Sequence, residues 1–339
     1  MVGPPPESWA IEPDLARTFD IAPGLWSFRL PLPWPSITHV NAYAIEHEDG
    51  IVLVDCGSAG DASHRGAIVA ALGLAGFTIE DVRVLVGTHT HSDHVGLAAW
   101  VIERSGAEFW MHPDTGHFYD GTREPERIAA ARERRSRREG VPERVLEFYA
   151  DVREETDGVL GAVAPDRPLA GGVKIESKLG DWEVIETPGH CPTHVCLVQR
   201  DRRLIILGDL VASAFSPWFD YGYSADPVAE YLSSLDTIEA LGPFSLALPG
   251  HGRPIENLPE AIALHRRGVA ERLEQTLAAI AAGPTGAYEL TYRVFGDLDD
   301  QAGVWKMTEI FGYLKHLRLA GKVTRDEDMD GTFSYRLAG

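Results

Sequence analysis

The first third of the chain contains short apolar runs separated by polar turns. Three of them predict neighbouring strands, at residues 25–30, 40–45 and 51–54. Residues 61–75 suit a helix, and the continuous apolar run at 82–86 is typical of a strand buried on both faces. This alternation predicts an α/β architecture in which sheets are covered by helices.

A second group of strands is predicted later in the chain, at residues 182–186, 194–199 and 204–207. In each group a buried strand ends in an acidic residue, Asp55 in the first and Asp209 in the second. The repeated feature suggests two similar sheet halves. The weak apolar content of residues 121–156, which are rich in Arg, Glu and Ala, predicts solvated helices in an insertion at about 113–165.

The last part of the chain has a different pattern. Residues 258–282 suit one long helix, which the Gly283-Pro284 pair then breaks. Beyond the break, residues 309–319 have apolar positions at helical spacing, and residues 321–337 suit a hairpin that turns at 330–331. We therefore divide the chain into a domain at 1–283 and a winged-helix-like domain at 284–339.

Candidate metal ligands cluster directly after the buried run at 82–86. Residues 89–94 read His-Thr-His-Ser-Asp-His, so four potential ligands, His89, His91, Asp93 and His94, lie within six residues. Imidazole and carboxylate groups suit Zn²⁺, Fe or Mn. Along an extended segment His89 and His91 point the same way, which leaves Asp93 and His94 free to face a second ion.

Three further candidates each follow a predicted strand and a glycine. They are His190 in Thr-Pro-Gly-His, Asp209 in Leu-Gly-Asp and His251 in Pro-Gly-His-Gly. Glycine allows the backbone to approach a neighbouring group closely. Each residue alone is unremarkable in a folded protein, but the combination with residues 89–94 is specific.

With these motifs the sequence resembles the metallo-β-lactamase superfamily from about residue 25 to 254. The resemblance implies a four-layer αββα sandwich that binds two metal ions, zinc first among them, with Fe or Mn as alternatives. It further implies one metal on His89, His91 and His190, the other on Asp93, His94 and His251, and a bridging Asp209. Asp93 and Asp209 are the catalytic carboxylates that it implies, beside a hydroxide that attacks the substrate.

Several residues near these motifs have two possible roles in the sequence. Asp55 either orients a ligand histidine or caps a turn, and His194 either supports the site or lies at a strand end. The aromatic run 215–223 forms either a wall for an acyl group or ordinary loop packing. We expect Cys191 to be inert, because it lacks the neighbours of a nucleophile. The remaining histidines are expected on the surface or in packing, namely His39, His47, His64, His112, His117, His265 and His316.

Charge and cysteine content narrow the partners and the compartment. The formal net charge of −20 disfavours nucleic acids and anionic membranes, which are themselves negative. Three cysteines are too few for a disulfide framework, and we find neither a signal peptide nor a run of about 20 apolar residues. We expect a cytoplasmic protein with a small-molecule partner, and a homodimer is possible.

Among the chemistries of this superfamily, hydrolysis of a thioester, ester or lactone fits the sequence best. The resemblance is strongest to the glyoxalase II-like and β-lactamase-like 2 branches, although no glutathione-binding set of basic residues is visible. Asp209 separates the chain from secreted zinc β-lactamases, which lack that aspartate. The alternatives are a persulfide dioxygenase with one iron on His89, His190 and Asp209, and a phosphodiesterase or ribonuclease. The segments 123–138 and 302–319 carry some basic residues, which we interpret as a solvated face and as a packing or dimerising helix.

Overall fold

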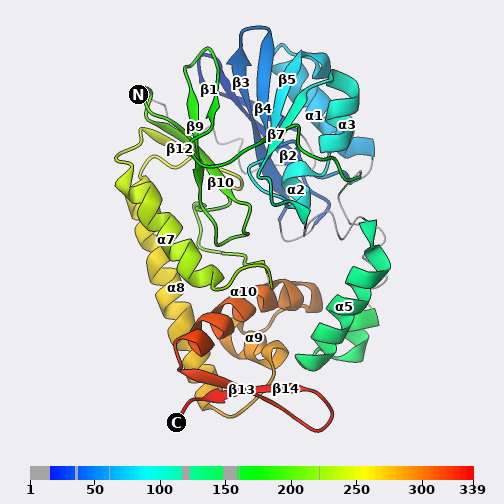
Figure 1. Ribbon diagram of the computed structural model, residues 1–339, viewed down its shortest axis with the longest axis vertical. Coiled ribbons are helices and arrows are strands. Elements are labelled where there is room, and N and C mark those ends of the chain that lie inside the picture. Colours follow the sequence, from blue (N-terminus) through cyan, green and yellow to red (C-terminus); the bar gives the residue numbers. More distant parts are fainter. Residues whose placement is uncertain are drawn as a thin grey trace.

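The computed structural model describes residues 16–34, 37–60, 62–116, 123–147, 159, 161–220 and 222–339. Two sheets lie face to face in its upper part (Figure 1). The first sheet has the strand order β1-β2-β3-β4-β5-β6-β7, antiparallel as far as β4 and parallel beyond it. Its strands are β1 (Arg17–Ala22), β2 (Leu25–Pro31), β3 (His39–His47), β4 (Gly50–Val54), β5 (Val82–Val86), β6 (Glu108–Met111) and β7 (Arg167–Pro168).

The second sheet has the order β12-β11-β10-β9-β8, and only its β11–β12 pair is parallel. Every residue of β10 and β11 is buried, because both faces of this sheet are covered. Its strands are β8 (Lys174–Ile175), β9 (Trp182–Glu186), β10 (Val195–Gln199), β11 (Leu204–Gly208) and β12 (Leu246–Pro249).

Three apolar clusters of the described residues define four layers. One lies between the helices α1 (Ala62–Leu74) and α3 (Ala98–Ser105) and the first sheet. A second fills the space between the two sheets. A third joins the second sheet to the helices α7 (Pro227–Ala240) and α8 (Leu258–Ala281). The expected four-layer αββα sandwich is therefore the fold.

The predicted strands and helices of the sandwich are present within one or two residues of their expected ends. The pattern did not reveal the short or partly exposed elements. β1 alternates poorly and lies half-exposed at the sheet edge, and β12 is only four residues long and ends in proline. The short helices α2 (Ser92–Val95) and α9 (Ala287–Phe295), the helices α3 and α7, and the 3₁₀ turn η2 (Ile79–Asp81) were also not predicted.

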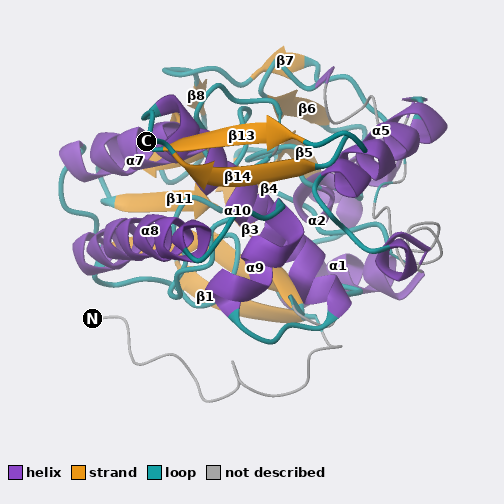
Figure 2. Cartoon of the chain, turned by 90° about the horizontal axis from the view of Figure 1, so that it is seen from below, coloured by secondary structure: helices purple, strands orange, loops and turns teal. Residues whose placement is uncertain are grey.

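The C-terminal part consists of α9, α10 (Asp300–Leu319) and the hairpin of β13 (Val323–Glu327) and β14 (Phe333–Leu337). Seen from below, the hairpin lies across these helices (Figure 2). The hairpin was predicted, but of α10 only residues 309–319 were, so the helix begins nine residues earlier than expected. Residues such as Met307, Tyr313 and Tyr335 belong to the same apolar cluster as α7 and α8. A separate winged-helix-like domain with a boundary at 283 stays a proposal.

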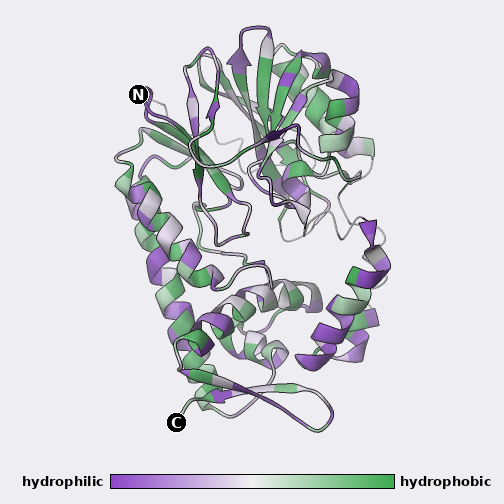
Figure 3. Cartoon of the chain, in the orientation of Figure 1, coloured by the Kyte–Doolittle hydropathy of each residue, from purple (hydrophilic) through white to green (hydrophobic). Residues whose placement is uncertain are grey.

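The described part of the insertion lies beside this C-terminal part. Its helix α5 (Pro125–Arg138) is strongly hydrophilic, as expected for a solvated helix (Figure 3). Directly after it, Val141 and Val145 are buried in the cluster that contains α10, and the buried Glu139 accepts hydrogen bonds from the Tyr335 hydroxyl. Residues 117–122, 148–158 and 160 of this insertion lie outside the described residues. Within the described chain, no helix has the length and apolar character needed to span a membrane.

Candidate metal centre

The seven predicted ligands come together at one end of the two sheets. Each lies just beyond a strand: residues 89–94 follow β5, with Asp93 and His94 on the short helix α2, and His190, Asp209 and His251 lie in the loops after β9, β11 and β12. Neighbouring strands bring these loops together although up to 162 residues of sequence, from 89 to 251, separate them. The structure therefore joins all seven side chains into one centre.

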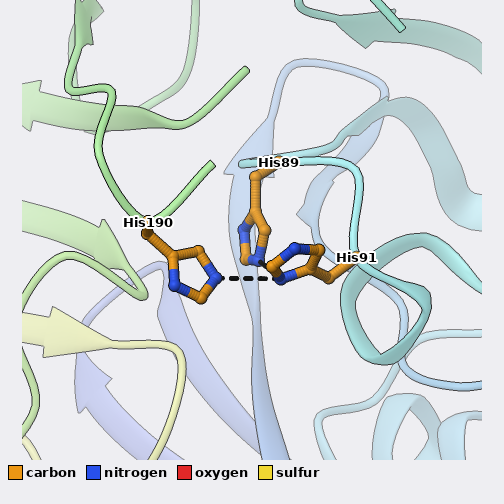
Figure 4. Close-up of side chains that lie close together, drawn as sticks. All are labelled: His89, His91 and His190. Carbon is orange, nitrogen blue, oxygen red and sulfur yellow. Dashed lines mark hydrogen bonds between the residues drawn. The ribbon is translucent and has the colours of Figure 1, made fainter. Parts of the chain in front are cut away.

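The first group consists of His89, His91 and His190, whose rings point toward one another (Figure 4). The Nδ1 atom of His91 lies 3.1 Å from Nε2 of His89 and 2.8 Å from Nε2 of His190. Imidazole nitrogens that face one another at these distances are three potential metal ligands around one position. A divalent cation with tetrahedral nitrogen ligands suits such a set.

The second group consists of Asp93, His94 and His251. The Oδ2 atom of Asp93 lies 3.2 Å from Nε2 of His251 and 3.7 Å from Nε2 of His94. Asp209 lies between the two groups. Its Oδ1 atom is 3.3 Å from His94 Nε2, and its Oδ2 atom is 3.3 Å from His251 Nε2 and 3.7 Å from His190 Nε2.

Two buried atoms of this centre test whether a cation fits. His94 Nε2 and Asp209 Oδ1 are both buried, and neither has a hydrogen-bond partner among the described residues. Because Nδ1 of His94 is paired with Asp55, its Nε2 atom faces the centre with a lone pair when the ring is neutral. Two buried acceptors that face each other are unfavourable without a positive charge between them. The donor set therefore fits a divalent cation beside Asp209.

Partners outside the centre hold the ligands in place. The carboxylate of Asp55 pairs with His94 Nδ1 at 2.7 Å and also accepts hydrogen bonds from the Thr88 amide and hydroxyl. Of its two proposed roles, orienting a histidine is the one observed. His194 is buried, and its Nε2 atom accepts a hydrogen bond from the Asp209 amide at 2.9 Å. His194 thus supports the backbone of the central carboxylate.

The loop after Asp209 positions two ligands of the first group, His91 and His190. The sequence did not predict this role of the loop. Asp220 Oδ1 lies 3.0 Å from Nε2 of His91, and the Asp220 amide donates to the His190 carbonyl at 3.0 Å. The Trp218 carbonyl lies 3.1 Å from Nδ1 of His190, so this ring nitrogen donates to it. No sequence signal identified Asp220, because it lies 129 positions from His91 and belongs to an aromatic run.

The residues of the aromatic run 215–223 have different roles. Trp218 lies beside the centre, with its ring centroid 6.4 Å from that of His91. Phe219 is 1% exposed and packs edge-on against Tyr231 and Tyr313 in the apolar cluster, so it is a core residue and no part of a wall. Tyr223 is exposed, and Tyr221 lies outside the described residues.

The glycines before the three distant ligands are close to other groups. A Cβ atom on Gly250 would lie 2.1 Å from Asp209 Oδ1, and one on Gly208 would lie 2.6 Å from His194 Nε2. At Gly189, where φ is +132°, it would lie 2.4 Å from the Tyr231 backbone. The expected close approach of the backbone is confirmed at all three positions.

Burial and neighbouring charges shift the pKa values of the ionisable groups in the centre. Burial lowers the pKa of His190 to about 4 and that of His89 well below its usual value, so both rings are neutral at neutral pH and able to ligate a metal. Burial also opposes ionisation of Asp93, but His94 and His251 outweigh it and hold the pKa of Asp93 at about 2. Burial opposes protonation of His94 and His251 as well, but Asp209 outweighs it, which raises the pKa of His251 to about 10 and that of His94 well above its usual value. The centre therefore combines neutral imidazoles at His89 and His190 with carboxylates that favour a positive charge beside His94 and His251.

Cys191, His265 and His39 are not among the seven predicted ligands, although the Cys191 thiol lies within 4.8 Å of ligand atoms of His91 and Asp220. Cys191 is buried, and burial raises the pKa of its thiol to a value at which it stays protonated, as the sequence predicted for an inert residue. His265 is a packing residue between the Tyr231 hydroxyl and the Ala212 carbonyl. The His39 carbonyl accepts a hydrogen bond from His251 Nδ1 at 2.8 Å, and its ring nitrogen Nε2 accepts one from the Gly252 amide at 3.4 Å. His117 lies outside the described residues.

Comparisons with known proteins agree with this fold. The family model of the metallo-beta-lactamase superfamily matches residues 36–251. A probable metallo-hydrolase of Bacillus subtilis, YqjP, is 24% identical over 309 residues, which are 88% of this chain and 93% of that protein. The crystal structure of a metallo-beta-lactamase family protein from Thermus thermophilus is similar with a TM-score of 0.82 and 28% identity, covering 94% of this chain and 99% of that one. Thioesterase pkgB of Emericella nidulans is 31% identical over 125 residues, 35% of this chain and only 34% of that protein.

Proposed function

Since the chain belongs to the metallo-beta-lactamase superfamily, we propose that it is a metal-dependent hydrolase that transfers the acyl group of a thioester, ester or lactone to water. The observation that carries this proposal is the geometry of seven converging ligands with two buried acceptor atoms facing each other. We propose that His89, His91 and His190 hold one divalent ion, that Asp93, His94 and His251 hold another, and that Asp209 bridges them. Zinc is our first choice, because imidazole and carboxylate ligands in closed groups suit it.

The metal ions and the protein's own side chains have different tasks in the proposed reaction. Two such ions, when bound, lower the pKa of a water molecule towards neutrality and polarise the oxygen of the acyl group. Asp93 is ionised at neutral pH, so it accepts a hydrogen bond from the attacking water and orients it. Asp209 places a negative charge between the two ligand groups.

The products follow from the bond that breaks. The hydroxyl of water adds to the acyl carbon, and the carbon–sulfur bond of a thioester, or the carbon–oxygen bond of an ester or lactone, breaks. The remaining proton goes to the leaving thiolate or alkoxide. Asp93 is the chain's own acidic group at this position, since its carboxylate belongs to the second ligand group and the residue is 8% exposed.

The surroundings of the centre favour an acyl compound over a polyanion. A net charge of −20 repels nucleic acid at long range. Trp218, an apolar ring with a single N–H donor, is the neighbour of His91. The partial similarity to a thioesterase agrees with this choice. We propose a small-molecule acyl substrate, no nucleic-acid partner and a cytoplasmic location, and a homodimer is compatible with all three.

One comparison of substrates tests the proposal. The metal-loaded protein is assayed at low ionic strength, where nucleic-acid binding is strongest, on a medium-chain acyl thioester, a γ-lactone, bis-p-nitrophenyl phosphate and single-stranded RNA. We expect kcat/KM to be highest on the thioester or the lactone. Faster cleavage of RNA or of the phosphodiester would identify a phosphodiesterase instead, and oxygen consumption with a persulfide would identify a dioxygenase.

A further inference from the structure

Three tryptophans from distant parts of the chain form a continuous row that starts at the metal centre. Trp218 lies beside His91, with ring centroids 6.4 Å apart. Trp305 of α10 contacts Trp218 at 6.4 Å, and Trp34, from the loop between β2 and β3, contacts Trp305 at 5.8 Å. All three contacts are edge-on, with interplanar angles of 80°, 86° and 88°. We name Trp218, Trp305 and Trp34 the tryptophan row.

The row differs from the aromatic packing nearby. Phe219, Tyr231 and Tyr313 have similar edge-on contacts, at 5.8 and 5.9 Å, but each of them is at most 1% exposed. The three tryptophans are each partly exposed. Trp218 and Trp305 also lie outside the three apolar clusters that the described residues form. Rings that contact one another in sequence and keep exposed surface are suited to a ligand rather than to a core.

The inner end of the row is held rigidly at the centre. The indole Nε1 atom of Trp218 donates to Asp220 Oδ1 at 3.3 Å, and the same oxygen pairs with His91. The Trp218 carbonyl accepts from His190. A single loop thus positions two ligands of the first group and the first ring of the row, so a substrate whose reacting carbon is at the centre has its apolar part directed along these rings.

From this arrangement we propose that the tryptophan row is the binding subsite for the acyl group of the substrate, and that it selects acyl groups bearing an aromatic ring. This rests on the proposed acyl hydrolysis. An aromatic ring of the substrate can pack edge-on against these indoles, as they pack against one another. An acetyl group is too short to reach them. The C-terminal part of the chain therefore contributes to substrate choice through Trp305.

Trp305 is the residue to change, because it belongs to the row but contacts none of the seven ligands. Trp305→Leu keeps an apolar side chain and removes the ring. The matched control is Trp100→Leu, since Trp100 is also partly exposed but lies on α3, where its ring contacts Arg104. Metal content and thermal unfolding are measured for both variants, so that a folding defect or a loss of metal is recognised.

Two readouts separate the row from the reaction. The first is the ratio of kcat/KM for a 6-phenylhexanoyl thioester to that for the acetyl thioester with the same thiol. The second is the Kd of the non-hydrolysable ketone analogue of the phenylhexanoyl thioester, measured by quenching of tryptophan fluorescence. We expect Trp305→Leu to lower the ratio about tenfold and to raise the Kd by a similar factor, as the loss of one or two ring contacts predicts. Trp100→Leu should leave both values unchanged.

Each result decides one of the two proposals. An unchanged ratio and Kd in a folded, metal-loaded Trp305→Leu variant overturns the row, and so does a ketone that does not bind the unaltered protein. An equal loss on both thioesters also overturns it, because Trp305 would then act through the structure alone. If neither thioester is hydrolysed but the ketone binds in a Trp305-dependent way, the row stands and acyl hydrolysis is wrong.

Discussion

All five ligand imidazoles have their second nitrogen paired with another group; for His89 this is the Thr88 hydroxyl, 3.0 Å from Nδ1. Carboxylates hold His91 and His94, through Asp220 and Asp55, whereas backbone carbonyls hold His190 and His251. A carboxylate partner makes an imidazole a stronger ligand and fixes its tautomer. Each group of ligands therefore contains one histidine that a carboxylate strengthens.

Asp220→Asn tests whether this outer carboxylate strengthens metal binding. The amide still accepts a hydrogen bond from His91 but carries no charge, so we expect affinity for one metal ion per chain to fall about 10- to 100-fold. Competition with a chromogenic chelator measures the affinity. Asp181→Asn, which changes an exposed carboxylate paired with Lys174, is the control. Chelator curves that coincide for the variant and the unaltered protein would exclude a role for Asp220.

Gly250→Ala tests how tightly the centre is enclosed. Its added methyl group would overlap Asp209 Oδ1 at 2.1 Å and His94 Cε1 at 2.7 Å. Since Gly250 has no positive φ, backbone strain does not contribute, and the expected loss of metal and of activity follows from displacement of Asp209 and His94. Gly66→Ala in α1, where a Cβ meets nothing within 4 Å, should keep full metal content and add roughly 0.5–1 kcal/mol of stability. Normal metal content in Gly250→Ala would show that the neighbouring groups move to accommodate the added methyl group without loss of metal.

At this scale the sequence predicted the ligands and offered Asp55 and His194 as possible supports, but it did not predict Asp220. Histidine clusters with carboxylates at close spacing are rare without a metal, so His89 to His94 were recognisable. Asp220 was not, because a lone aspartate in a loop has many possible roles. Trp218 and Phe219 are adjacent and aromatic, yet one faces the centre and the other the core, and only the path of the loop decides between them.

Helices and strands with a regular hydrophobic pattern were predictable from the sequence. Elements whose burial depends on contacts with distant parts of the chain were not. The strands β5 and β9 have the predicted bounds, although neither is buried throughout as expected for β5, because the charged side chains of Arg83 in β5 and Glu186 in β9 are exposed. The insertion was expected to be solvated throughout. Instead Glu139, Val141 and Val145 are buried against the C-terminal part, so deleting the segment is expected to cost stability as well as to alter substrate preference.

Glu139 gives this contact a pH dependence. Burial raises the pKa of its carboxyl above the usual 4.5, and the hydrogen bond from Tyr335 only partly offsets this. The folded state therefore holds the proton more tightly than the unfolded state, so this group's contribution to stability is complete below pH 4.5 and is lost as the pH rises through the raised pKa.

Glu139→Gln should remove that dependence, because glutamine keeps an acceptor for Tyr335 and does not titrate. We expect the Tm of the variant, relative to the unaltered protein, to be higher at pH 7.5 than at pH 4. Calorimetry at the two values measures it, with Glu147→Gln on the exposed part of the same segment as the control. A Tm difference that is the same at both values would contradict the raised pKa.

On the scale of the whole molecule, the fold brings loops from both sheets to one end and adds the C-terminal part beside them. The sandwich followed from the order of predicted elements together with the family resemblance. The contact of Trp305 with Trp218 and Trp34 did not, because it depends on how α10 lies against two loops that precede it by 87 and 271 positions in the sequence. Long-range placement of this kind has no local signal.

The measurement that tests the central claim most directly is the number of transition-metal ions bound per chain. Elemental analysis of the protein, purified and reconstituted with an excess of zinc and then freed of unbound metal, should give about two ions per chain, as the two ligand groups with Asp209 between them require. Asp209→Ala should reduce that number. One iron ion per chain, with oxygen consumption and no gain from zinc, would contradict the account.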